Sequence, residues 1–242
     1  MNTKRLKILY LKAVHKYFGR FTKPDLFNRI LRYEGFEIGE GTIFYTPVVI
    51  DRQRPWMLKI GKYCKITRGV TILTHDYSRS VLRRVYGEII GEARMTTIGD
   101  NVFIGVNSTI LMGAQIGNNV IIGAGSVVGG VIPDNTVVSG NPAKVIRTLE
   151  EHYQRRKQNV LKEAKIWFES YKDRFGHYPP ESAAGPFFPL FTNRETFDYE
   201  NDKRLFCNGD NMEEVIADFR KGTPMFKSFK EFIKYLKDEA NN

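Results

Sequence analysis

Histidine is the residue type best suited to proton transfer near neutral pH, and one of the four histidines in this chain has a context that favours catalysis. His75 ends the stretch Thr-Ile-Leu-Thr-His and precedes Asp76. A neutral imidazole with an ordinary pKa of about 6.5 can take a proton from a hydroxyl or amine nucleophile and later return it to a leaving group. Asp76 is poorly placed to orient the ring, because successive strand side chains point to opposite faces. We therefore expect a backbone carbonyl to hold the imidazole.

The remaining histidines and the cysteines do not form a metal site. His15, His152 and His177 lie in segments that are predicted to be helices or loops. Cys64 and Cys207 are too few for a disulfide framework or a four-cysteine zinc site, so a reducing cytoplasm is the expected compartment. A zinc enzyme needs three protein ligands, and the repeat region described next holds a single histidine. We expect no metal.

The element that positions His75 is a repeat with a period of six. Sixteen of the 21 glycines lie between residues 35 and 140, where an aliphatic residue recurs at every sixth position. The clearest run is Ile98, Ile104, Ile110, Ile116, Ile122 and Val128, preceded by two runs with the same spacing, Ile60, Ile66 and Ile72 and, more faintly, Ile38, Phe44 and Ile50. This period matches neither a helix nor a hairpin. It indicates a short strand and a sharp turn, of which three close a triangular coil that stacks on the next coil.

Three stretches of this repeat resemble a known family: IGKYCKITRGVTILTHD, TTIGDNVFIGVNSTILMGAQIGNNVIIGAGSVV and IPDNTVVSGNPAKVIR. Over about residues 36 to 147, the chain resembles the hexapeptide acyltransferases, within them the maltose and galactoside O-acetyltransferase type. The resemblance implies a mainly β fold, a left-handed parallel β-helix, although the general rule for crossovers would favour the opposite hand. It also implies that His75 is the general base.

The same resemblance implies acetyl-CoA as the acyl donor, with its pantetheine arm in a groove along the coils between two subunits. The matching positions for the arm are Phe103, Gly105, Val106, Ala124 and Gly125, and those for the phosphates are Lys144 and Arg147. One departure is the pair Gly129 and Gly130, where the family often has Thr-Lys. We expect a backbone N–H near Gly105 to stabilise the tetrahedral oxyanion.

The acceptor side of the site is less defined by the sequence. Asp51 and Tyr45 lie in early coils, and we expect them to face His75 from an adjacent subunit and bind the acceptor. The flat faces of the coils and the family's intersubunit sites predict a homotrimer. The leading hypothesis is an O-acetyltransferase acting on a hydroxyl of a sugar or polysaccharide precursor. The alternatives are an N-acetyltransferase acting on an amino sugar and a non-catalytic β-helix scaffold.

Three segments interrupt or flank the repeat. Residues 77–97 carry no hexad and are expected to leave the coil as a loop. Residues 1–35 have the spacing of amphipathic helices, and residues 148–242 read as a helical and loop extension with a helix over 149–174. Capping-box spacings predict two further helices, which begin near Asn211 and Ser228.

The formal net charge of +10 arises mainly from the N-terminal segment, where residues 1–35 hold nine Lys and Arg against two acidic residues. We expect these helices to cap the first coil, with peripheral contact to an anionic membrane as the alternative.

Nucleic-acid binding is not expected, since the coils lack an interleaved basic and aromatic surface. No stretch approaches the length of a bilayer span and no signal peptide is evident, so we expect a cytoplasmic protein that contacts membranes at most peripherally.

Overall fold

The computed structural model describes residues 8–9, 25–205 and 209–240. It divides into two compact units, one ending at His152 and the other beginning at Tyr153. Apart from residues 8 and 9, which are helical, the part of the predicted N-terminal helices before residue 25 lies outside the described residues. None of the helices described is long and apolar enough to cross a membrane.

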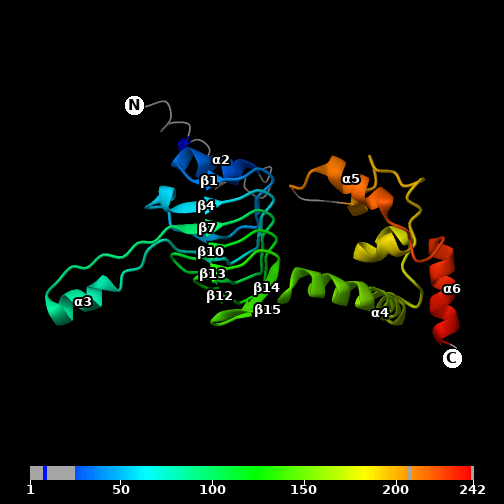
Figure 1. Ribbon diagram of the computed structural model, residues 1–242. Coiled ribbons are helices and arrows are strands. Elements are labelled where there is room, and N and C mark those ends of the chain that lie inside the picture. The colour runs from blue at the N-terminus through cyan, green and yellow to red at the C-terminus, as the bar shows by residue number, and fades with distance from the viewer. Residues whose placement is uncertain (1–7, 10–24, 206–208, 241–242) are drawn as a thin grey trace. The chain divides into compact units, whose positions relative to one another are not determined.

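The first unit is a stack of triangular coils whose short strands form three sheets, seen as parallel rungs in Figure 1. The first face comprises β1 (Glu37–Ile38), β4 (Leu58–Ile60), β7 (Thr96–Ile98), β10 (Gln115–Ile116) and β13 (Val131–Ile132). The second face comprises β2 (Ile43–Phe44), β5 (Lys65–Ile66), β8 (Phe103–Ile104), β11 (Ile121–Ile122), β14 (Thr136–Gly140) and β15 (Ala143–Thr148). The third face comprises β3 (Val49–Ile50), β6 (Thr71–Ile72), β9 (Thr109–Ile110) and β12 (Val127–Val128). All neighbours pair in parallel except β14 and β15, so the predicted parallel β-helix is confirmed.

The aliphatic residues of the hexads form the interior of the coil stack. Ile72 pairs with Ile110 in the next coil, and both side chains are fully buried. Cys64 is also fully buried, as expected of a small core residue, and burial raises the pKa of its thiol. Each fully buried aliphatic side chain contributes roughly 1.5–3 kcal/mol, so the continuous column is the main source of stability in this unit.

The turns between the first and second faces are stabilised by ladders of short polar side chains. Asn101, Asn119 and Asn135 have positive φ angles, which asparagine tolerates better than most residues. Their side chains are linked by hydrogen bonds of 2.9 Å from Asn101 Nδ2 to Asn119 Oδ1 and from Asn119 Nδ2 to Asn135 Oδ1. At the same corner, Gly99 leaves no room for a side chain, since an added Cβ would lie 2.7 Å from the Gly117 carbonyl carbon.

We predict that Gly99→Ala destabilises the first unit by about 1–3 kcal/mol, because the new methyl group must push two coils apart. The matched control is Gly91→Ala, whose Cβ would meet nothing within 4 Å. Chemical denaturation of the two variants and the wild type measures the difference. Equal stability of the two variants would contradict close stacking at this corner.

The largest interruption of the coils is an arm formed by residues 76–95, which extends away from the stack in Figure 1. Its base is fixed by an antiparallel bridge between His75 and Ala93 and by a 3.1 Å hydrogen bond from Arg94 N to Thr74 O. The segment predicted as a loop contains a helix, α3 (Arg79–Tyr86), and its last residues already belong to β7. The arm therefore leaves and rejoins the stack beside His75.

The N-terminal end of the stack is covered by α2 (Asp25–Glu34). Phe27 packs edge-on against Phe44 of the first coil at a centroid distance of 5.2 Å, and Leu31 is fully buried. Asn28 Nδ2 donates a 2.5 Å hydrogen bond to Thr42 O. This helix thus buries apolar surface of the first coil that would otherwise face water.

The second unit is helical and has its own aromatic core, so the predicted helical extension is confirmed. Its helices are α4 (Leu149–Phe175), α5 (Met212–Lys221) and α6 (Phe229–Ala240), with 3-10 turns η3 (Glu181–Ala183), η4 (Gly185–Leu190) and η5 (Lys203–Leu205). Both predicted helix starts are confirmed, since Asn211 and Ser228 accept hydrogen bonds from Glu213 N and Glu231 N. Phe168, Phe191 and Phe232 are nearly completely buried and pack against one another.

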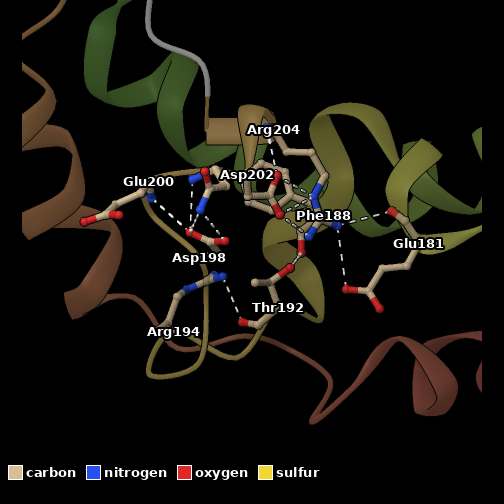
Figure 2. A network of polar contacts seen from close by, with 9 residues as sticks. Glu181, Phe188, Thr192, Arg194, Asp198, Glu200, Asp202 and Arg204 are labelled. Atoms are coloured by element: carbon tan, nitrogen blue, oxygen red, sulfur yellow. Dashed lines mark hydrogen bonds and ion pairs between the residues drawn. The ribbon is translucent and has the colours of Figure 1, made fainter.

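A polar network closes one side of this aromatic core (Figure 2). Arg204 donates hydrogen bonds to both carboxylate oxygens of Asp202 and to Glu181 O, and its guanidinium lies 5.2 Å from the ring centroid of Phe188. The hydrogen bonds from Arg204 hold the pKa of Asp202 below its ordinary value. Arg204, Asp202 and Glu181 O satisfy one another in this network, which favours a structural role.

Candidate active site

The imidazole of His75 is held by a carboxylate from the preceding coil of the same chain. His75 Nδ1 is hydrogen-bonded to Asp51 Oδ2, and the buried Thr74 hydroxyl donates to the same oxygen. The Asp51 side chain is 6% exposed and that of His75 is 24% exposed. The prediction of a backbone carbonyl at this position is therefore wrong. Asp51, which was expected to face His75 from an adjacent subunit, contacts it within the same chain.

The contact follows from the pairing of β3 with β6. Val49 and Ile50 pair with Thr71 and Ile72, so the chain leaves the third face at the same edge in both coils. Asp51 N donates a 3.2 Å hydrogen bond to Ile72 O, which fixes the start of the turn beside the strand that leads to His75. The partner was missed in the sequence because it lies 24 positions away, although both segments share the hexad register.

The electrostatics of this pair determine which ring nitrogen is free. Burial alone would raise the pKa of Asp51, but hydrogen bonds from Thr74, Gln53 N and His75 outweigh it, and the pKa is lowered from the ordinary value of 3.8. An ionised carboxylate only accepts hydrogen bonds, so His75 Nδ1 carries the proton. In the neutral ring, Nε2 then carries the lone pair and can accept a proton from a substrate. Because the pKa of Asp51 is lowered on folding, its stabilising contribution is complete above pH 3.8 and is lost as the pH falls through the lower folded value.

Asp76 has a different role from Asp51, in agreement with the expectation that it does not orient the ring. Asp76 Oδ1 accepts hydrogen bonds from Ser78 N at 3.0 Å and Ser78 Oγ at 2.7 Å. The two bonds from Ser78 lower the pKa of this exposed carboxyl. Asp76 thus shapes the first turn of the arm.

The residues predicted for the acyl donor lie along a different edge, between the second and third faces. Gly125 N donates a 2.8 Å hydrogen bond to Val106 O, and a Cβ at Gly105 would lie 2.5 Å from Ala124 N. Phe103 and Val106 are 42% and 46% exposed, and Ala124 and Gly125 are exposed too. On β15, Lys144 pairs with Ser139 and Arg147 with Val137, so both cations lie on the strand that ends the second face. This edge offers apolar surface beside basic residues.

The oxyanion donor expected near Gly105 is not the amide of Gly105 itself. Gly105 N donates a 2.9 Å hydrogen bond to Ile122 O in the next coil, as the stacking of β8 and β11 requires. This amide is committed to holding the coils together. It therefore cannot also stabilise an oxyanion without breaking a bond between coils.

Within one chain, the third face separates His75 from the predicted donor edge. Each coil enters this face at the edge of Gly105 and leaves it at the edge of His75. Tyr45, predicted to bind the acceptor, is 40% exposed and precedes β3, so it lies at the donor edge and not beside Asp51. Among the residues that the structure describes, no three His, Cys, Asp or Glu side chains are grouped to hold a metal ion.

Comparison with known proteins agrees with this architecture. The family model "Bacterial transferase hexapeptide (six repeats)" matches residues 95–130. The chain is 38% identical to protein CapG of Staphylococcus aureus over 57% of this chain and 80% of that protein. It is 35% identical to the putative acetyltransferase YvoF of Bacillus subtilis over 62% of this chain and 86% of that protein. It is 34% identical to galactoside O-acetyltransferase of Escherichia coli over 49% of this chain and 59% of that protein.

The chain belongs to the hexapeptide-repeat transferase family. It is an acetyltransferase with a parallel β-helix, as the resemblance implied.

We predict that the proton on the His75 ring resides on Nδ1 at neutral pH, because Asp51 accepts a hydrogen bond there. In Asp51→Asn the ring loses its anionic acceptor, and the two tautomers become more equally populated. Nitrogen-15 chemical shifts of the labelled imidazole distinguish the tautomers. A wild-type ring with its proton on Nε2 would contradict this assignment, and Asp76→Asn serves as the control that leaves the ring unchanged.

Proposed function

We propose that this chain is an acetyl-CoA-dependent O-acetyltransferase that acts on a hydroxyl of a sugar or polysaccharide precursor, with His75 as the general base. The observation that carries the proposal is the contact of His75 Nδ1 with the buried carboxylate of Asp51. It leaves Nε2 as a proton acceptor at the edge of the coils. Transfer to oxygen is supported by the name of the Escherichia coli relative, galactoside O-acetyltransferase.

The reaction assigned to this site is a single acyl transfer. His75 Nε2 takes the proton of the acceptor hydroxyl while the oxygen attacks the thioester carbonyl carbon. Asp51 stabilises the imidazolium that forms and keeps the ring in place. When the carbon–sulfur bond breaks, the ring returns the proton to the thiolate, which gives an O-acetyl ester and free coenzyme A. The exposed Phe103 and Val106 suit the pantetheine arm, and Lys144 and Arg147 suit the phosphates.

We predict that His75→Ala lowers kcat by about 100-fold or more, because the general base is lost. The KM of acetyl-CoA should change little, because the substitution leaves the donor groove intact. Thiol release from acetyl-CoA with a panel of sugars, nucleotide sugars and amino sugars measures the rate. His177→Ala is the matched control, since this exposed histidine lies in the second unit. Wild-type rates in His75→Ala would exclude the proposed base. If an amine acceptor reacts faster than every hydroxyl acceptor, the proposed O-transfer is wrong and N-transfer takes its place.

We further propose that the working enzyme is a homotrimer with its sites between chains. One chain holds His75 and the donor edge on opposite sides of the third face, so a second copy is needed to bring a base and a donor groove together. The arm supports this proposal, because its helix and the residues after it leave large apolar side chains in water. These are Val81, Val85, Tyr86, Ile89 and Ile90, each at least 54% exposed. Such a stripe is typical of a surface that a partner covers.

We predict that Val85→Glu weakens the trimer by about tenfold or more, because a carboxylate would be buried at the contact of the arm. Arg84→Glu is the control, as this residue lies next to Val85 in α3 but on the polar side of the helix. Sedimentation at micromolar concentration should show three chains for the wild type and the control and smaller species for Val85→Glu. A monomeric wild type that is fully active would contradict sites shared between chains.

A further inference from the structure

The coil that precedes the coil of His75 has an enlarged turn. Two side chains of this turn, Trp56 and Arg54, are not explained by the packing of the fold. After β3 the chain forms the turn Asp51–Met57, which includes the 3-10 helix η2 (Pro55–Met57), before it enters β4. Trp56, the middle residue of η2, is 68% exposed. An indole ring in water at this position contributes little to stability, so its role is more readily explained by binding.

A second side chain of this turn lacks a partner. Arg54 Nη1 is buried and has no hydrogen-bond partner in the described part of the chain. By contrast, Arg52 on the same turn is paired, with its Nε 3.4 Å from Glu34 Oε2. A buried guanidinium nitrogen without an acceptor is costly, and a bound anion would supply the missing acceptor.

The turn is held against the active site at both of its ends. At its start, Asp51 contacts His75. At its end, Leu58 pairs with Thr96, where the arm rejoins the stack two residues after Arg94, whose amide is bonded to Thr74 O. Three residues span at most about 11 Å, so the Cα atom of Arg54 lies within about 11 Å of the Cα atom of Asp51. Figure 1 shows the short helix before β4 at the edge of the stack from which the arm extends.

We propose that this turn is an acceptor subsite for an anionic sugar, in which Trp56 stacks on the apolar face of the ring and Arg54 binds a carboxylate or phosphate group. The guanidinium matches the planar geometry of either anion, and the indole offers a large rigid surface at low entropic cost. The inference rests on the proposed function and deepens it, since it assigns the class of acceptor that reaches His75.

Tryptophan fluorescence tests binding directly, because Trp56 and Trp167 are the chain's two tryptophans. In a Trp167→Phe background, a methyl hexoside, the matching uronic acid glycoside and the matching hexose phosphate are titrated separately. We expect saturable quenching by one or both anionic sugars at concentrations where the neutral sugar has no effect, and the better quencher identifies the anion. Arg54→Gln should weaken this binding by about 10- to 100-fold. Lys59→Gln, which removes a cation paired with Glu37 on the adjacent strand, should not.

Acetyl transfer with the same three sugars separates the two proposals. Arg54→Gln should raise the KM of the anionic acceptor by about 10- to 100-fold and change that of the neutral sugar by less than about threefold. His75-dependent transfer with no preference for anionic sugars would overturn the subsite and leave the proposed function standing. Specific quenching without transfer to any sugar would overturn the proposed function and leave the subsite standing. Equal quenching by all three sugars, or none by any, would overturn the subsite.

Discussion

The candidate active site depends on the in-register stacking of two successive coils. Asp51 and His75 are 24 positions apart, and they meet because Ile50 stacks on Ile72 at the end of paired strands. A slip of one residue would turn every side chain of β3 to the opposite face and remove the carboxylate from the ring. The fully buried Ile72 and Ile110 make such a slip costly. The register of β3 on β6 therefore sets both the packing of the core and the geometry of the acid–base pair.

The period of six was sufficient to predict the strands, the buried column and the coil that carries His75, since each depends on local spacing. The partner of His75 was not predicted, because neither the residue next to the histidine nor a backbone carbonyl holds the ring. Register alone contains this information: residues at equivalent hexad positions lie one above another, so the turn after Ile50 must adjoin the turn after Ile72. The helix α3 was missed for a different reason, since eight residues give a weak periodic signal.

Hydrogen bonds between coils occupy some backbone groups that the residue type alone would suggest for catalysis. Gly105 appeared suitable as an oxyanion donor from its residue type, yet stacking uses its amide to bind Ile122 O. In a solenoid with two-residue strands, the residues at each corner supply many of the hydrogen bonds between coils. The Gly105 amide is therefore not free to bind an oxyanion. A turn that departs from the regular coil is not subject to this constraint.

Two such departures occur at the same corner in successive coils. The regular coil crosses this corner within Leu111–Ala114, whereas the coils above it use the turn Asp51–Met57 and the arm of residues 76–95. Because each coil contacts only its neighbours, extra residues at one corner leave the packing at the other two corners unchanged. Catalytic groups therefore lie at the ends of rigid strands, while the added turns are free to differ in length and composition. Selectivity for the acceptor can change there without disturbing the pair that moves the proton.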